Sequence, residues 1–319
     1  PESFWHPAPG YAVMAGKGLA GDPAGKRRWR MIPATFEYVR AHTVEEAIRL
    51  LQQYGDRAKL LAGGHSLLPL MKLRLSQPEV LIDLGRIQEL KGIREEGDSL
   101  VIGAMTTHDE VAASPLVQQR CPLLAEAASQ IGDLQVRNMG TIGGSLAHAD
   151  PAADYPAAVL ALEAEITCQG PGGSRTVKAT DWFVDLLTTA LQPGEVLTQV
   201  RVPVHKPGQG WAYLKVPHPA SGYALVGVAC MLTLDGSTCR EARLAVTGVG
   251  PKAVRLGNVE QALVGKTLDE PTVGEAARRA AEGLEATDDP LYASAEYKRH
   301  LATVYTKRAI LKALERARG

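Results

Sequence analysis

The sequence predicts an α+β protein of two mixed domains, and three observations support this prediction. Apolar runs typical of strands alternate with short helix-like segments from residue 31 to residue 204. Three longer strand-like segments follow, and helical patterns end the chain. The length of 319 residues is enough for two domains of ordinary size.

Residues 1–30 do not share this organisation. They have no sustained period and end in a basic cluster at 26–30, after which a signal peptide would have an apolar run. Instead Met31 follows, and we expect it to be a natural start. We therefore expect residues 1–30 to be a leader, derived from upstream sequence or added for expression, and favour this over an arm that anchors a partner.

In the first domain, each expected element has a local signal. Thr43 and Glu46 have the spacing of a capping box, which predicts a helix that ends at Gly55. Thr107 and Glu110 repeat this signal at the start of a second helix. The other expected elements are strands at 32–36, 60–61, 80–83, 100–102 and 165–168, helices at 66–75 and 122–131, and a short helix after residue 151.

The segment 207–210, Pro-Gly-Gln-Gly, is the best candidate for a linker, because it combines a proline, whose φ is restricted, with two conformationally flexible glycines. We therefore expect one domain over 31–206 and a second over 207–319. The second domain is expected to contain three strands, at 211–216, 224–234 and 241–246, with a tight turn at Asp235-Gly236. Helices are expected at 259–263, 273–284 and 293–317.

Composition and charge exclude several classes of function. Lys plus Arg and Asp plus Glu number 35 each, and this zero net charge argues against a nucleic-acid-binding protein. No stretch approaches the roughly 18–20 apolar residues of a membrane span, so we expect a cytoplasmic protein, with at most peripheral contact at the inner face of the membrane. The four cysteines include no Cys-x-x-Cys pair, so we expect no zinc site or iron–sulfur cluster in this chain.

Two glycine-rich segments are the strongest candidates for a binding site. The first, Ala62-Gly63-Gly64-His65-Ser66-Leu67, follows a predicted strand, and the second ends in Thr141-Ile142-Gly143-Gly144-Ser145. Neither has the spacing of a Rossmann dinucleotide motif or of a Walker A loop. Paired glycines reach positive φ and let successive N–H groups converge on an anion oxygen. With a hydroxyl beside each pair, the two segments are predicted to clamp a pyrophosphate from both sides.

Nearby polar residues suggest binding more than catalysis. His65 has no local partner that would make it a catalytic base, so we expect it to lock the backbone or face a phosphate. His148, Asp150 and Asp154 lack a compact third ligand group, which favours loop hydrogen bonds or contact with a cofactor hydroxyl over a metal site. No catalytic residue and no metal ligand is nominated.

The segments 62–74 and 141–154, the latter ending in His-Ala-Asp-Pro-Ala-Ala-Asp, resemble the FAD-binding medium subunits of molybdenum hydroxylases, the xanthine dehydrogenase family. Within this family the sequence most resembles the aerobic carbon monoxide dehydrogenases, and the resemblance runs from Met31 to the C-terminus. It implies a two-part FAD-binding domain of the vanillyl-alcohol-oxidase (PCMH) type, followed by a smaller α+β domain of the carbon monoxide dehydrogenase flavoprotein type.

The resemblance also implies roles for individual residues. Residues 62–67 and 141–145 match the two pyrophosphate-binding segments, and Asp154 matches an acid that binds FAD hydroxyls. Lys215 matches a lysine near the polar edge of the isoalloxazine, and Tyr223 an aromatic residue packed against the flavin. Without the resemblance, Lys215 would be interpreted as a strand lysine reaching solvent and Tyr223 as a core aromatic.

The implied function is electron transfer within a larger enzyme. A large molybdenum–pterin subunit would oxidise the substrate, a small subunit would carry two two-iron two-sulfur clusters, and FAD here would pass electrons to an external acceptor such as a quinone. The assembly would be a dimer of heterotrimers that converts CO and water to CO2. The alternatives are another molybdenum hydroxylase, acting on an aromatic, heterocyclic or aldehyde substrate, and a flavin-less subunit for binding or assembly.

Overall fold

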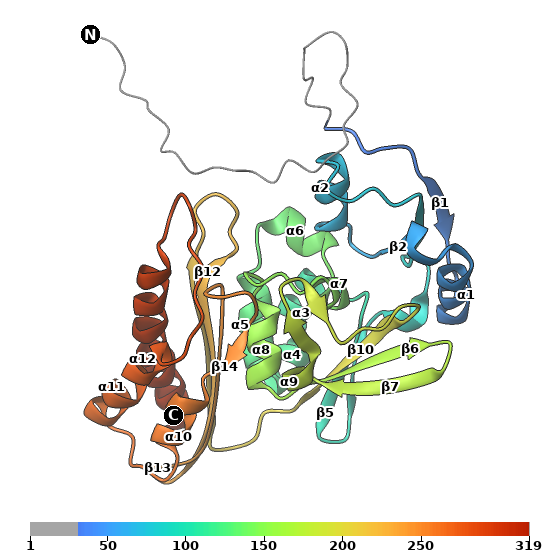
Figure 1. Cartoon of the computed structure of the whole chain (residues 1–319). Coiled ribbons are helices and arrows are strands. Elements are labelled where there is room, and N and C mark those ends of the chain that lie inside the picture. Colours follow the sequence, from blue (N-terminus) through green and yellow to red (C-terminus); the bar gives the residue numbers. More distant parts are fainter. Residues whose placement is uncertain (1–30, 319) are drawn as a thin grey trace, which may run out of the picture.

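The computed structural model describes residues 31–318, which form three parts with separate apolar cores (Figure 1). The expected leader, residues 1–30, lies outside the described residues. Two of the parts precede residue 205, so the first expected domain is itself in two pieces, and the third part follows. One face of the third part's sheet, with Tyr213, Ala229 and Met231, completes the apolar core of the second part. Among the helices of residues 31–318, none combines the length and apolarity needed to cross a bilayer.

The first part is a small parallel sheet with one long helix beside it. Its elements are β1 (Glu37–Arg40), α1 (Val44–Tyr54), β2 (Ala58–Leu61), α2 (Leu67–Lys72) and β3 (Val80–Asp83), and the strand order is β1-β3-β2. Thr43 caps α1 by accepting from the Glu46 N–H at 3.1 Å, as predicted. The strand expected at 32–36 begins at Glu37 instead, because its partner β3 begins only at Val80, opposite Glu37.

The second part contains a five-stranded antiparallel sheet and most of the short helices. The sheet order is β4-β5-β10-β6-β7, with β4 (Ile93–Glu96), β5 (Ser99–Gly103), β6 (Glu165–Gly170), β7 (Gly173–Lys178) and β10 (Val196–Pro203). The helices are α3 (His108–Ala113), α4 (Pro115–Arg120), α5 (Pro122–Ser129), α6 (Leu134–Met139), α7 (Ile142–His148), α8 (Tyr155–Ala161) and α9 (Ala179–Trp182), and β8 (Phe183–Asp185) pairs with β9 (Thr188–Thr189). The capping box of Thr107 and Glu110 is complete. The sequence prediction missed the central strand β10.

The third part is a four-stranded antiparallel sheet covered by helices. It contains β11 (Gln209–Pro217), β12 (Ala224–Asp235), β13 (Thr238–Thr247), β14 (Val254–Arg255), α10 (Gly257–Leu263), α11 (Glu270–Arg278) and α12 (Ala295–Arg318). The three expected strands and the turn at Gly236 are confirmed, whereas β14 was missed. Gln209 and Gly210 belong to β11, so the expected linker is shorter than predicted. The helix α12 packs on one face of this sheet, and α5 and α8 lie on the other (Figure 1).

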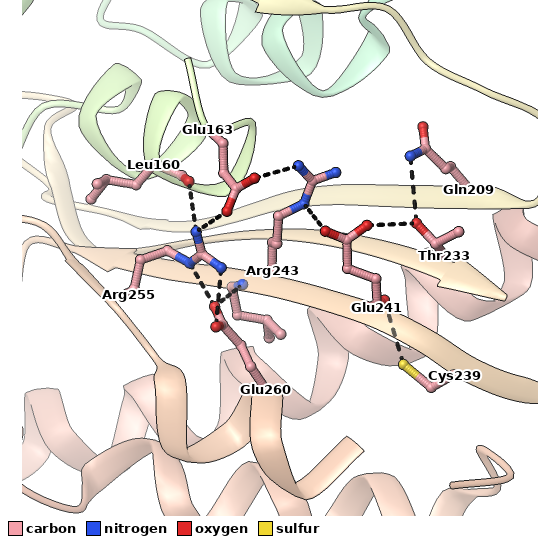
Figure 2. A network of polar contacts seen from close by, with 10 residues as sticks. Leu160, Glu163, Gln209, Thr233, Cys239, Glu241, Arg243, Arg255 and Glu260 are labelled. Atoms are coloured by element: carbon pink, nitrogen blue, oxygen red, sulfur yellow. Dashed lines mark hydrogen bonds and ion pairs between the residues drawn. The ribbon is translucent and has the colours of Figure 1, made fainter. Parts of the chain in front are cut away.

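A polar network joins α8 to the third part. Arg255 binds Glu260 at 2.6 Å and Glu163, just after α8, at 3.2 Å, and Arg243 binds the other oxygen of Glu163 at 3.2 Å (Figure 2). These contacts fix the C-terminal end of α8 against β13 and β14. Asp154 lies at the opposite end of α8, so both ends of this helix lie where the second and third parts meet.

Candidate functional site

The two glycine-rich segments, which the sequence predicts to hold a pyrophosphate between them, lie directly against each other. A Cβ atom on Gly63 would lie 1.9 Å from the carbonyl oxygen of Met139, and one on Gly144 would lie 3.6 Å from the Cβ of Ala62. The first distance is shorter than any real contact, so only glycine allows the backbones to approach this closely at residue 63. The two segments, one from the first part of the fold and one from the second, therefore form one continuous wall of the candidate binding site.

The first segment presents a run of unpaired main-chain donors. Within residues 31–318, the N–H groups of residues 63–67 make no hydrogen bond. Gly64 has a φ of 75°, which turns the chain at this point, and the His65 ring places Nδ1 2.9 Å from the carbonyl oxygen of Gly63. His65 therefore locks the backbone, which is one of its two expected roles. Successive free amides at a turn are the usual arrangement for binding an anion.

The second segment differs, because it is the start of α7 and its amides already have acceptors. Thr141 caps this helix by accepting from the Gly144 N–H at 3.1 Å. The Ile142 N–H donates to Thr106 at 3.0 Å, and the Gly143 N–H donates to Ala104 at 2.9 Å. The expectation that this segment offers converging amides is therefore wrong for these three donors.

The glycines of the second segment have a steric role. Neither Gly143 nor Gly144 has a positive φ, which corrects the sequence expectation. A Cβ atom on Gly143 would lie 2.5 Å from the Cβ of Ala104, so close packing against the chain excludes a side chain there. What this segment can still offer a ligand is its hydroxyls, on Thr141 and Ser145, which stay predicted contacts.

Asp154 and Lys215 form a buried ion pair between the second and third parts. The Lys215 Nζ lies 3.0 Å from each carboxylate oxygen of Asp154 and 2.7 Å from the carbonyl oxygen of Gln130. Each side chain of the pair is only 3% exposed. The Tyr213 hydroxyl also donates to Asp154, at 2.5 Å. Burial raises the pKa of Asp154 above its ordinary value, although Lys215 and Tyr213 both favour the ionised form.

Sequence reasoning missed Tyr213, although a signal was present. Residues two apart in a strand share a face, so Tyr213 must lie on the same side of β11 as Lys215. Both Asp154 oxygens already accept hydrogen bonds from this chain. A cofactor hydroxyl would therefore be an additional donor to an engaged carboxylate, and that contact stays a prediction.

Tyr223 brings the third part to the first glycine-rich segment. It is 38% exposed and is the last residue of the loop between β11 and β12. Burial of the hydroxyl and the nearby Asp150 carboxylate raise the pKa of Tyr223, while the Ser66 hydroxyl lowers it. The next residue, Ala224, donates its N–H to the carbonyl oxygen of Ala152 at 3.0 Å. Tyr223 thus lies near Ser66 of the first glycine-rich segment, and the flavin contact that the resemblance implies for Tyr223 stays a prediction.

The buried side chain of His108 packs against the second glycine-rich segment at Gly140. Burial, with the nearby His65 and Arg137, lowers the pKa of His108 to about 4, so its ring is neutral at pH 7. A Cβ atom on Gly140 would lie 2.5 Å from its Nε2, which explains the glycine at that position.

His148 Nε2 and Asp150 Oδ2 are 4.0 Å apart, and residues 31–318 contain no group of three or more His, Cys, Asp or Glu that could hold a metal.

Comparisons with protein families match nearly the whole described chain. A family described as "FAD binding domain in molybdopterin dehydrogenase" matches residues 34–205. A second, described as "CO dehydrogenase flavoprotein C-terminal domain", matches residues 211–313.

Individual relatives are similar over nearly their full length. The carbon monoxide dehydrogenase medium chain of Hydrogenophaga pseudoflava is 48% identical over 280 residues, which cover 88% of this chain and 97% of that one. The alpha subunit of the 6-hydroxypseudooxynicotine dehydrogenase complex of Paenarthrobacter nicotinovorans is 39% identical over 289 residues, covering 90% and 97%.

Solved structures of related enzymes have the same fold as this chain. Carbon monoxide dehydrogenase from Hydrogenophaga pseudoflava matches with a TM-score of 0.87 and 48% identity, over 89% of this chain and 99% of that one. Quinoline 2-oxidoreductase from Pseudomonas putida 86 matches with a TM-score of 0.85 and 36% identity, over 90% and 99%.

Proposed function

Because this chain belongs to the medium, FAD-binding chains of molybdenum-containing dehydrogenases, we propose that it holds FAD between an iron–sulfur partner and an external electron acceptor. Its role is that of an oxidoreductase subunit, and the substrate-oxidising centre belongs to another chain of the enzyme. Bound FAD supplies a redox centre that accepts electrons singly or in pairs. The partners we propose are a large molybdenum–pterin subunit and a small iron–sulfur subunit, in a dimer of heterotrimers, with a quinone-type acceptor.

One observation carries the proposal that FAD binds here. The free N–H groups of residues 63–67 offer donors to an anion. The second glycine-rich segment packs against the first, at Gly63 and Ala62, and so supports its backbone. The pyrophosphate of FAD is an anion of the right kind for such donors. We propose that residues 62–67 bind the pyrophosphate through main-chain amides and that residues 141–145 contribute mainly hydroxyl contacts.

The charged residues of the site would act on the electronics of the bound ring. A charge close to a flavin changes the free energy of adding electrons to it. Lys215 and Asp154 lie together at the meeting point of the second and third parts, so the pair presents nearly balanced charge. We propose that Lys215 lies near the polar edge of the ring and that Asp154 holds the ammonium in place. Tyr223 would cover the ring from the third part.

Carbon monoxide is the substrate we favour for the assembled enzyme. The support is the 48% identity to a carbon monoxide dehydrogenase medium chain and the match of residues 211–313 to the corresponding C-terminal domain. The second candidate is an enzyme that acts on a heterocyclic compound, since relatives named for quinoline and 6-hydroxypseudooxynicotine are 36% and 39% identical. No residue of this chain would contact the substrate in either case.

Purification of the chain with its associated subunits tests the proposal. We expect one FAD per chain and bleaching of the flavin absorbance when CO is added without an acceptor. Full flavin occupancy without reduction by CO, together with reduction by a heterocyclic substrate, would support the second candidate. A complex that holds its partners but lacks flavin would contradict the proposed function and favour a binding or assembly subunit.

A further inference from the structure

The loop between β11 and β12, residues 218–223, is organised by a single residue that the flavin assignment does not use. The His218 N–H donates to the carbonyl oxygen of Tyr223 at 2.7 Å. The carbonyl oxygen of His218 accepts from the Gly222 N–H at 2.9 Å. The backbone of His218 therefore closes the loop and brings Tyr223 back beside the end of β11.

The ring of His218 fixes the interior of the same loop. Its Nδ1 atom lies 3.2 Å from the Ala220 nitrogen, 3.3 Å from the Ser221 nitrogen and 3.1 Å from the Ser221 hydroxyl. An imidazole nitrogen that accepts from main-chain N–H groups must be unprotonated, so in the neutral ring the hydrogen is on Nε2. The Ser221 hydroxyl in turn accepts from the Tyr223 N–H at 3.4 Å.

A second loop, between α11 and α12, holds the ring from outside. The Nε2 of His218 lies 3.4 Å from an oxygen of Asp289. The other oxygen of Asp289 accepts from the N–H groups of Leu291 and Tyr292, at 3.0 and 2.9 Å. The ring of Tyr292 meets that of His218 edge to face, with centroids 4.5 Å apart. His218 is thereby anchored to a part of the chain that is distant in sequence.

The opposite side of the 218–223 loop faces the second part of the fold, between α5 and α6. Gly222 has a φ of 71°, and a Cβ atom there would lie 3.5 Å from the Cα of Gly132. Tyr223 follows directly, beside Ser66. We propose that His218 is a positioning residue, which fixes Tyr223 at the first glycine-rich segment through the acceptor Nδ1. The inference rests on the proposed function, because the flavin contact of Tyr223 is itself proposed.

Two substitutions of His218 distinguish the role of its hydrogen-bond acceptor from the role of its aromatic ring. His218→Asn keeps a side-chain acceptor that can bond an N–H two residues further on, as asparagine does in turns. His218→Phe keeps an aromatic ring beside Tyr292 but has no acceptor. Tyr223→Ala defines the full effect of losing the tyrosine. In the FAD-loaded complex, the two readouts are the flavin midpoint potential and the hydrogen exchange of the amides at 220–222.

We expect His218→Phe to accelerate exchange at Ala220 and Ser221 by about tenfold or more, since their acceptor is removed. We also expect it to move the flavin potential in the same direction as Tyr223→Ala, by at least about half that shift. His218→Asn should stay near the wild type in both readouts.

The inference is overturned if His218→Phe matches the wild type in both readouts, or if His218→Asn is as impaired as His218→Phe. It is also overturned if Tyr223→Ala leaves the flavin potential unchanged. A wild-type complex without FAD would contradict the proposed function instead, and hydrogen exchange would then still decide whether His218 holds the loop.

Discussion

The ammonium nitrogen of Lys215 lies 3.0 Å from both carboxylate oxygens of Asp154, in a place where each side chain is only 3% exposed. The lysine comes from β11 and the aspartate from the start of α8, so the pair joins the third part of the fold to the second. An isolated charge costs several kcal/mol to bury, so each residue depends on the other. The pair is therefore a structural joint, and in our proposal it is also a source of charge beside the flavin.

The two members of this pair should shift the flavin potential in opposite directions. Lys215→Gln leaves an uncompensated carboxylate, which disfavours added electrons, so the midpoint should fall by tens of millivolts. Asp154→Asn should raise it by a similar amount. Redox titration of the FAD-loaded complex measures both, with Lys206→Gln as an exposed control. Shifts of the same sign, or none, would remove the pair from the flavin site.

The same pair predicts strong coupling in stability. Lys215→Met alone should lower the free energy of unfolding by about 3–5 kcal/mol, because Asp154 is left buried without its partner. Adding Asp154→Leu should recover part of that loss. Urea unfolding of the wild type, both single variants and the double variant gives the coupling energy. Strictly additive losses would show that the ion pair does not hold the two parts together.

Glycine substitutions should separate sites of close packing from open ones. Gly63→Ala forces a Cβ against the Met139 carbonyl oxygen, so the two segments must separate and FAD retention should fall by about tenfold or more. Gly143→Val should act in the same way through Ala104. Gly172→Ala is the matched control, because nothing lies within 4 Å of its Cβ position. Equal FAD content by absorbance in all three variants would refute this account of the wall.

Acid should destabilise the folded chain through His108. Its pKa is about 4 when folded and near its ordinary value of 6.5 when unfolded, so below pH 6.5 the unfolded state binds more protons. The free energy of unfolding should therefore fall as the pH drops from 6.5 towards 4. Between pH 7 and pH 5 the wild type should lose about 2 kcal/mol more than His108→Asn. Parallel losses in denaturant titrations of the two proteins would contradict this assignment.

Local patterns predicted the elements that present the site but not its polar contacts. The capping residues Thr43 and Thr107 and the strand before Gly63 are visible in short stretches of sequence, and the structure confirms them. The partners of Lys215 and His218 are not visible in this way, because Asp154 and Asp289 are brought to them only by the packing of whole parts. The glycines at 143 and 144 were misinterpreted as a flexible turn, since a sequence does not distinguish a glycine needed for φ from one needed for space.

Hydrogen exchange at the two glycine-rich segments tests the central claim most directly. The complex is compared with its flavin removed and with FAD restored. The amides of residues 63–67 have no acceptor within residues 31–318, so FAD should slow their exchange by about tenfold or more. The amides of residues 142–144 already have acceptors and should change little. Exchange at 63–67 that is unaffected by FAD would contradict the proposal that these amides hold the pyrophosphate.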